Sequence, residues 1–465
     1  MPYENQYGSK TAHSDVVRNP DVQAFLNECQ PLREPSEQAS KELASCFIEP
    51  PDYSKDAETS FIIASDGSYY ASSIDARLPS IQVAYLKFGT ILIEMKDFSG
   101  LEDKTTQMID PFRVSALQKN RDTLALVLPL SNFRLPIDDS VRATFRRQMD
   151  GFLWSEATRF RLDDASTSLM GTLIELALMR ERGNDHPGTV YVHKCPSTNC
   201  EAEHLQLDPQ QPSHTCPTCG APVYISDCLR LWEAVSDYNP NQEPSSRFMS
   251  YVEHLLPIHY LRFLRDAAPA QLNDLAILVD GPLAVFGQAA WLHQCIMRFL
   301  HKLRETQQAK GFKVPVVMGL QKSGYVVEYM NLLRRHIPCN RLFSITDEFR
   351  HEYLGIEQSG NGFGSETYYG HDFAFKTPSH KLFVFSLPYP FPNKRPATSF
   401  RNDKADIMRY PELPRALNLI TQVETDLYRD ALVPIALAHR HTAISLKPGG
   451  RVLDVMGKAA RGQRM

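Results

Sequence analysis

The sequence predicts an α/β protein built on a mixed β-sheet that is flanked by helices. Apolar runs rich in Ile, Val, Tyr and Phe, typical of strands, alternate with segments whose apolar residues recur every three or four positions, typical of helices. Two of the apolar runs end in the same way, with an aspartate followed by a glycine, at Asp66 and at Asp280. The first strands follow one another closely and are expected to be antiparallel. Later strands are reached through helices.

Length and composition describe an ordinary globular protein. The chain has 465 residues, enough for two or three domains or one large core, with 43% hydrophobic and 22% charged residues. It contains no apolar run long enough for a transmembrane helix, and its first residues lack the basic and apolar regions of a secretion signal. The nine cysteines, an odd number, argue against a disulfide framework. We therefore expect a cytoplasmic protein with no membrane contact.

The net charge of −4 and the pI near 6.4 exclude a histone-like coat of positive charge. They do not exclude an enzyme that binds nucleic acid through a local basic channel.

The first half of the chain divides into an arm, the start of the sheet and a helical region. Residues 1–57 are polar and are expected to form an N-terminal arm that packs on the main body, with one amphipathic stretch at 22–29. Strands are expected at 60–64, 81–88 and 90–94, the last two joined by a tight turn at Gly89. Residues 139–182 are predicted to be mainly helical, from apolar residues at helical spacing.

The second half alternates regularly between helices and strands. We expect helices at 247–266 (interrupted by Pro257), 289–307, 326–336 and 413–441, strands at 275–279, 314–319, 341–345, 371–376, 381–387 and 452–455, a glycine-rich loop at 355–364 and a proline-rich excursion at 388–414. The predicted divisions are the arm at 1–57, the first part of the core at 58–187, a small inserted unit at 188–227, and the second part of the core at 228–465.

The inserted unit carries four cysteines in two short knuckles. These are Cys195 and Cys200 with four residues between them, and Cys216 and Cys219 with two, followed by Gly220. Four thiolates at such spacing suit a tetrahedral structural zinc ion, and a unit this small could not bury enough core without one. The flanking strands are similar to the arms of a zinc ribbon. Because the first knuckle is looser than usual, His193, His204 and His214 are alternative ligands.

Asp66 and Asp280 are the first candidates for catalysis. A strand that delivers an aspartate into a glycine turn places a carboxylate at the rim of the sheet, and two such strands can hold a hard divalent cation. Asp-Gly is also a common turn dipeptide, so each motif taken alone favours a simple turn, and it is the pair that favours a site.

A metal site for phosphate chemistry needs further ligands. Glu253 lies on the helix before the Asp280 strand, next to apolar residues, and Glu175 is the alternative third carboxylate by the same reasoning. His439 lies in a largely apolar helix, where it is either a site residue or a core histidine. Lys322 follows a buried strand, but no phosphate-binding P-loop motif is present, which excludes P-loop nucleotide hydrolysis.

The order of these parts resembles the NurA nuclease family over residues 60–455. The resemblance implies an RNase H-like core and a manganese-dependent (or magnesium-dependent) DNA nuclease with 5′→3′ exonuclease and single-strand endonuclease activity. It also implies a homodimer that docks on the hexameric HerA translocase in DNA end resection or in defence against foreign DNA. The family's aspartates fall on Asp66 and Asp280, its glutamate on Glu253 and its histidine on His439. A family tyrosine is matched by Tyr428, although at a different spacing, and the zinc ribbon is a departure from the compact family members.

The leading hypothesis is therefore phosphodiester hydrolysis by a two-metal mechanism. Asp66, Glu253, Asp280 and His439 would hold Mn²⁺ or Mg²⁺, and Lys322 would neutralise the phosphate. One alternative is a non-catalytic adaptor of a translocase complex that binds DNA and docks its partner through the zinc ribbon. A third hypothesis, a transposase or Argonaute-type enzyme, shares the carboxylates but would need a DNA-recognition or guide-binding domain, of which the sequence gives no sign.

Overall fold

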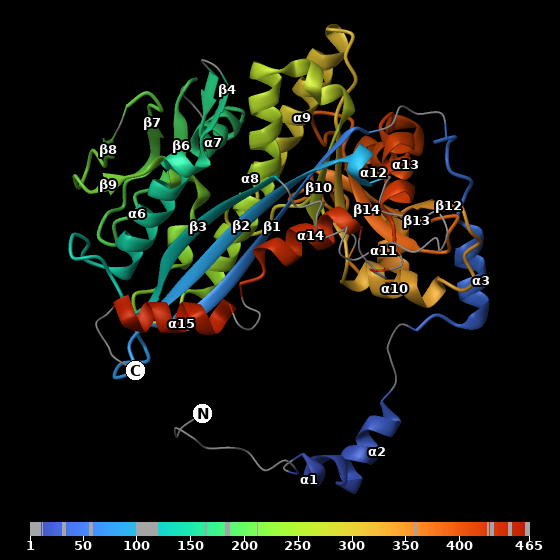
Figure 1. Ribbon diagram of the computed structural model, residues 1–465, viewed down its shortest axis with the longest axis horizontal. Helices are drawn as coiled ribbons and strands as arrows, with labels where there is room; N and C mark the ends of the chain where they lie inside the picture. The colour runs from blue at the N-terminus through green and yellow to red at the C-terminus, as the bar shows by residue number, and fades with distance from the viewer. Residues whose placement is uncertain are drawn as a thin grey trace.

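The computed structural model describes residues 11, 13–29, 34–54, 59–98, 120–162, 165–181, 187–211, 213–357, 360–425, 427, 432–444 and 449–460. It has the predicted α/β architecture, with one large mixed sheet and helices on both of its faces (Figure 1). Within the described residues this sheet has eight strands, in the order β12-β13-β14-β11-β10-β1-β2-β3. Their bounds are β1 (Phe61–Ser73), β2 (Gln82–Glu94), β3 (Asn120–Ser131), β10 (Leu275–Asp280), β11 (Val316–Gln321), β12 (Arg341–Ser344), β13 (Gly370–Lys376) and β14 (Leu382–Pro388).

The centre of the sheet is parallel and its two sides are antiparallel. Strand β10 pairs in parallel with β1 on one side and with β11 on the other. The pairs β1–β2, β2–β3, β11–β14, β13–β14 and β12–β13 are antiparallel. Because β1 is longer than β10, the carboxyl end of β10 lies beside the middle of β1, at Ser65 and Asp66.

The two faces of the sheet are covered by different helices. Alternate side chains of a strand point to opposite faces; in β1, Ile63 joins one apolar cluster, whereas Ile62 and Ala64 join another. The cluster around Ile63 includes buried residues of α6 (Val141–Trp154), α7 (Leu169–Leu178), α8 (Gln242–Ala267) and α9 (Leu292–Ala309). The cluster around Ile62 includes residues of α13 (Leu413–Val423) and α14 (Val433–Thr442). The sheet therefore separates α8 from α14.

The remaining elements lie around this core. The short strands β6 (Val190–Lys194), β7 (Glu203–Leu207), β8 (His214–Thr215) and β9 (Pro222–Val223) form two hairpins whose apolar residues join the same cluster as α6 to α9. The other elements are α3 (Glu37–Ser45), α4 (Met95–Phe98), β4 (Phe160–Leu162), β5 (Ala165–Thr167), α10 (Tyr325–Leu333), α11 (Asp347–Glu352), α12 (Ala397–Ala405) and α15 (Gly449–Ala460), with 3₁₀ helices at Glu156–Thr158, Ile225–Leu229, Leu231–Ala234, Pro269–Asp274 and Ile407–Arg409. None of the described helices is both long and apolar enough to cross a membrane.

The predicted N-terminal arm packs on the body only in part. Helix α3 buries Leu43 and Ala44 in a cluster that also contains residues of α10. Helices α1 (Ser14–Val17) and α2 (Pro20–Glu28) have no buried residue and lie apart from the rest of the molecule (Figure 1). The predicted divisions at 57, 187 and 227 stay predictions.

Two glycines that were expected to form turns lie inside long strands. Strand β1 does not end at Asp66 but continues through Gly67 to Ser73, and β2 runs without a break through Gly89, so the predicted turn there is wrong. In the antiparallel register, Asp66 lies opposite Gly89, and Gly67 lies opposite Phe88. Each glycine instead makes room for a side chain from a helix, as described below.

Other predicted boundaries are also wrong. Pro257 does not interrupt α8, which runs from Gln242 to Ala267. The predicted strand at 452–455 is part of helix α15, because a short apolar run does not by itself distinguish strand from helix. The predicted helix at 413–441 is two helices, α13 and α14, and strand β3 was not predicted at all.

Buried histidines, among them His259 and His293, make the fold sensitive to acid. Burial lowers the pKa of His259 to about 4 and that of His293 to about 3. Both values lie below the value of about 6.5 in an unfolded chain, so the unfolded state binds more protons. The contribution of these histidines to stability is therefore fully present above about pH 6.5. The free energy of unfolding decreases as the pH falls towards 4, by about 1–2 kcal/mol for each histidine at pH 5.

Urea unfolding at pH 7.5 and pH 5.0 measures this loss. Replacing His259 by Asn removes one of the buried histidines with a lowered pKa, so the variant should lose about 1–2 kcal/mol less between the two pH values than the parent protein. An equal loss in both proteins would contradict the assignment of acid sensitivity to His259.

Candidate functional site

The candidate site begins at the central parallel pair of strands. Asp66 lies on β1 and Asp280 is the last residue of β10, and the register Ser65 opposite Val279 brings the two aspartates to the same level of the sheet. Gly281, which follows, has a φ of 103°, a conformation that favours glycine, and turns the chain away from the sheet. Of the two Asp-Gly pairs, only the second therefore forms the turn that the sequence suggested.

Helix α14 adds a histidine to the two aspartates. Nδ1 of His439 lies 3.3 Å from Oδ2 of Asp66. One ligand atom each from Asp66, Asp280 and His439 lie within 4.8 Å of one another. The His439 side chain is 61% exposed, so this residue is not the buried core histidine that its apolar helix allowed. An accessible imidazole beside two carboxylates is instead available to a ligand.

Thr442 also contacts Asp66 and was not predicted from the sequence. Its hydroxyl donates a hydrogen bond to Oδ2 of Asp66, and the residue is completely buried. Burial of Asp66 raises the pKa of this carboxyl, the Thr442 hydroxyl and His439 lower it, and Asp280 raises it. Thr442 follows His439 by about one helical turn, and this spacing in the sequence could have indicated that the two residues lie on the same face of the helix.

Glu253 approaches Asp66 from the opposite side of β1. It lies on α8, and its carboxylate accepts a hydrogen bond from the backbone of Gly67. Burial, followed by the charges of Asp66 and Asp280, raises the pKa of Glu253 to about 8. Glu253 is not one of the three residues whose ligand atoms lie within 4.8 Å of one another, but it shares their electrostatic environment.

Glu175, the alternative third carboxylate, has a different setting. It accepts hydrogen bonds from Arg262 at 2.5 Å and from Arg265 at 2.5 Å. Although burial raises the pKa of Glu175, the two arginines hold it below its usual value. These ion pairs join α7 to α8, so the structure brings Glu253 and not Glu175 towards Asp66 and Asp280.

Lys322 completes the group of charged residues. It follows β11, the strand next to β10, and its Nζ donates to Oδ2 of Asp280 at 2.6 Å. Both side chains of this ion pair are partly exposed. Tyr428, the remaining residue that the sequence suggested, lies outside the described residues.

Gly67 and Gly89 allow the two helices to reach Asp66. A Cβ atom at Gly67 would lie 2.5 Å from Oε1 of Glu253, and a Cβ atom at Gly89 would lie 2.7 Å from Cγ2 of Thr442. Both distances are shorter than van der Waals contact, so any other residue would displace the side chains of Glu253 and Met249, or those of Thr442 and His441. The glycines are required by these close approaches and not by a turn.

The donor set fits a divalent cation. Carboxylate oxygens and an imidazole nitrogen are ligands that Mn²⁺ and Mg²⁺ accept. Burial, with smaller contributions from the charges of Asp66 and Asp280, raises the pKa of Glu253, and a nearby cation would favour its charged form. Lys322 is the one ammonium group that contacts Asp280 among the described residues.

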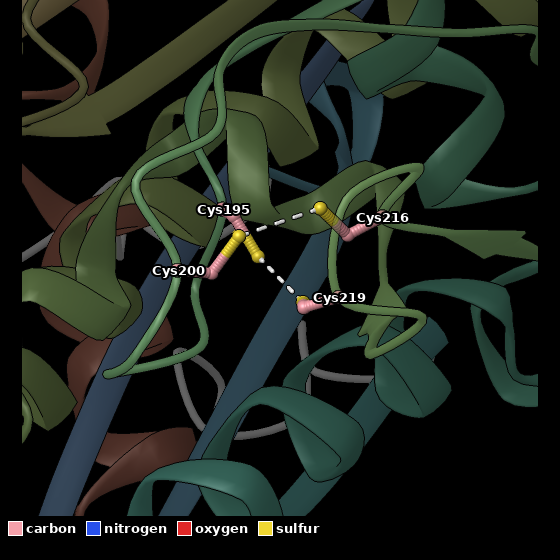
Figure 2. Close-up of side chains that lie close together, drawn as sticks. All are labelled: Cys195, Cys200, Cys216 and Cys219. Atoms are coloured by element: carbon pink, nitrogen blue, oxygen red, sulfur yellow. Dashed lines mark hydrogen bonds between the residues drawn. The ribbon is translucent and has the colours of Figure 1, made fainter.

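A second candidate metal site lies in the 188–227 unit. Ligand atoms of Cys195, Cys200, Cys216 and Cys219 lie within 4.8 Å of one another, and Figure 2 shows the four sulfur atoms turned towards a common centre. The Sγ atoms of Cys195 and Cys219, and those of Cys200 and Cys216, are 3.7 Å apart. This four-cysteine cluster could hold a zinc ion.

The local backbone favours a thiolate at Cys216. Burial raises the pKa of Cys216, but backbone N–H groups of Cys219 and Thr218 outweigh it and lower that pKa to about 6. Gly220 closes the knuckle with a φ of 72° and donates its N–H to the Cys216 carbonyl. The alternative histidine ligands have other partners: His193 and His204 hydrogen-bond with Tyr191, and His214 with the Asp208 carbonyl.

Comparisons with known proteins give little further information. No protein-family model matches the chain, and no curated protein matches it. Among solved structures, the NurA nuclease from Sulfolobus solfataricus is similar, with 9% sequence identity, a TM-score of 0.32, and coverage of 97% of this chain and 95% of that chain. At this TM-score the similarity supports no conclusion about the fold or activity of this protein.

Replacing Gly67 by Ala tests the contact with Glu253. In an ordinary strand this change would stabilise the protein by about 0.5–1 kcal/mol, but here the steric clash should destabilise it by about 1–3 kcal/mol. Replacing Glu253 by Ala removes the obstructing carboxylate. In the double variant the Gly67→Ala change should therefore cost at least about 1 kcal/mol less, as measured by urea unfolding of the full cycle. Additive effects would contradict the contact.

We expect the four-cysteine cluster to bind about one zinc ion per chain. The Cys216→Ser variant should lose the ion and unfold at a lower temperature, because metal binding contributes to the folding of so small a unit. Zinc content by atomic absorption and thermal unfolding measure the two effects. Cys29→Ser is the matched control, since Cys29 is exposed and lies outside the cluster. Equal zinc contents in the two variants would exclude the cluster as the zinc site.

Proposed function

We propose that the protein is a metal-dependent DNA nuclease. The observation that carries this proposal is the convergence of Asp66, Asp280 and His439, whose ligand atoms lie within 4.8 Å of one another. Lys322 adds an ammonium group that contacts Asp280, and Glu253 adds a third carboxyl group from the other face of β1, close enough for the charges of Asp66 and Asp280 to act on it. Carboxylates that gather where a central strand ends, together with a cationic side chain, suit phosphodiester hydrolysis.

The sheet supports an RNase H-like core as part of the proposal. Strands β3, β2 and β1 form an antiparallel meander, and β10 and β11 follow in parallel on the far side of β1. The first carboxylate lies inside the first strand of this unit, and the second lies at the end of the adjacent parallel strand. This arrangement is the one expected of an RNase H-like sheet.

Each residue of the site has a definite role in the proposal. Asp66, Glu253, Asp280 and His439 would hold Mn²⁺ or Mg²⁺, which in such sites lowers the pKa of bound water and offsets charge on the phosphate. Thr442 holds one oxygen of Asp66 in a fixed orientation. Lys322 offers an ammonium group to the phosphate. Exposed His439 is accessible to exchange a proton with solvent.

The finer assignments rest on the resemblance to the NurA family. They comprise the two-metal mechanism, 5′→3′ exonuclease and single-strand endonuclease activity, a homodimer, and partnership with a HerA-type translocase in end resection or in defence against foreign DNA. The four-cysteine cluster suits a structural zinc ion in this scheme, since its cysteines are built into hairpins packed on α6 to α9.

Cleavage of a fluorescent single-stranded oligonucleotide in the presence of Mn²⁺ tests the proposal. Asp66→Asn and Asp280→Asn should each lower the cleavage rate at least about 100-fold, with DNA affinity unchanged within about threefold, because they remove ligand charge but little volume. Chelation of Mn²⁺ should stop cleavage by the parent protein.

Glu175→Gln and Glu253→Gln distinguish the two carboxylates. Glu253→Gln should abolish cleavage, whereas Glu175→Gln should lower thermal stability through its lost ion pairs and keep the cleavage rate of the folded protein. Manganese-dependent cleavage that survives in both aspartate variants would overturn the proposal. DNA binding without any cleavage by the parent protein would favour the non-catalytic adaptor.

A further inference from the structure

Lys322 lies where a cation bound to Asp280 would lie. Its Nζ is 2.6 Å from Oδ2 of Asp280, and Asp280 contributes a ligand atom to the group that it forms with Asp66 and His439. We propose that Lys322 is a resident cation that competes with the divalent ion for Asp280 until a DNA phosphate attracts its ammonium group, so that metal and DNA bind cooperatively. This inference rests on the proposed nuclease function and adds a form of regulation at the same site.

The ion pair is placed to open easily. The side chains of Lys322 and Asp280 are 28% and 25% exposed. Partly exposed ion pairs contribute little net stability, because both charges can be hydrated when they separate. Arg262 and Arg265, in contrast, donate three hydrogen bonds to Glu175 and so connect α8 to α7. The Lys322–Asp280 pair has one such bond and can exchange its partner.

A new anion makes the exchange of Lys322 for a divalent ion more favourable. Asp66, Glu253 and Asp280 supply three carboxyl groups, and Lys322 offsets part of their charge. A divalent ion that takes over Asp280 leaves the ammonium group without its partner. A phosphate brought by DNA supplies a new one, and the flexible four-carbon side chain of lysine allows the ammonium group to reach it.

Thermodynamic linkage then determines how metal binding and DNA binding affect each other. If Lys322 opposes metal binding and phosphate removes this opposition, DNA must raise the affinity for the metal, and the metal must raise the affinity for DNA by the same factor. In the absence of DNA the protein would bind the metal weakly, and the metal site would be fully occupied only when DNA is bound. Such coupling protects DNA that is not correctly placed in the site.

The direct test is the affinity for Mn²⁺ in the absence of DNA, measured from free Mn²⁺ by electron paramagnetic resonance on zinc-loaded protein. Lys322→Met keeps the length of the side chain and removes the charge, so it should bind Mn²⁺ about tenfold more tightly than the parent protein. Lys310→Met is the matched control and should leave the affinity unchanged. Lys310 is exposed and precedes β11, whereas Lys322 follows it, so the two lie at opposite ends of that strand.

The second measurement repeats the titration with a single-stranded oligonucleotide whose phosphorothioate linkages resist cleavage but keep their charge. The affinity of the parent protein for Mn²⁺ should rise about tenfold, whereas that of Lys322→Met should change less than about threefold. Lys322→Gln serves as a second variant if thermal unfolding shows that Lys322→Met is not folded.

Unchanged or weaker Mn²⁺ binding by a folded Lys322 variant, in the absence of DNA, would overturn the inference. A different result would show that the proposed function is wrong while the role of Lys322 holds. If the variant binds Mn²⁺ more tightly but the oligonucleotide affects neither protein, Lys322 is a resident cation and DNA is not the ligand that releases it.

Discussion

The site depends on the absence of two side chains in the middle of the sheet. Gly67 and Gly89 lie next to Asp66, one along β1 and the other directly across on β2. Gly67 leaves room on one face for Glu253 from α8, and Gly89 leaves room on the other face for Thr442 from α14. Helices that the sheet separates therefore both approach β1 at this level: α14 contacts Asp66 through Thr442, and α8 contacts the neighbouring Gly67 through Glu253. Any Cβ at these positions would meet a helix side chain at less than van der Waals distance.

This close approach concentrates negative charge in a partly buried place. Three carboxyl groups share the site, and the pKa of Glu253 is raised to about 8 by burial and by its neighbours. The Thr442 hydroxyl and His439 stabilise the charged form of Asp66, and Lys322 neutralises Asp280. Ionisable groups with shifted pKa values that gather in this way are typical of functional sites, and the ligand atoms of Asp66, Asp280 and His439 could hold a cation.

Much of this could be predicted from the sequence, because it follows from local pattern. The alternation of elements indicated the α/β sheet, and the matching Asp-Gly pairs indicated that Asp66 and Asp280 would meet. The cysteine knuckles predicted the cluster of four thiols, which the structure brings together. What could not be predicted depends on contacts between distant segments. Which helix packs on which face of the sheet explains why Gly67 and Gly89 are glycines. It also determines the role of Thr442 and the difference between Glu175 and Glu253.

The central claim is that Asp66, Asp280 and His439 form a divalent cation site that Glu253 supports. The most direct measurement is anomalous diffraction at the manganese absorption edge from crystals soaked in Mn²⁺. The account predicts an anomalous peak within coordination distance of Asp66 and Asp280, with Lys322 moved away from Asp280. Full occupancy of other manganese sites with no peak between the two aspartates, in crystals that leave the site open to solvent, would contradict it.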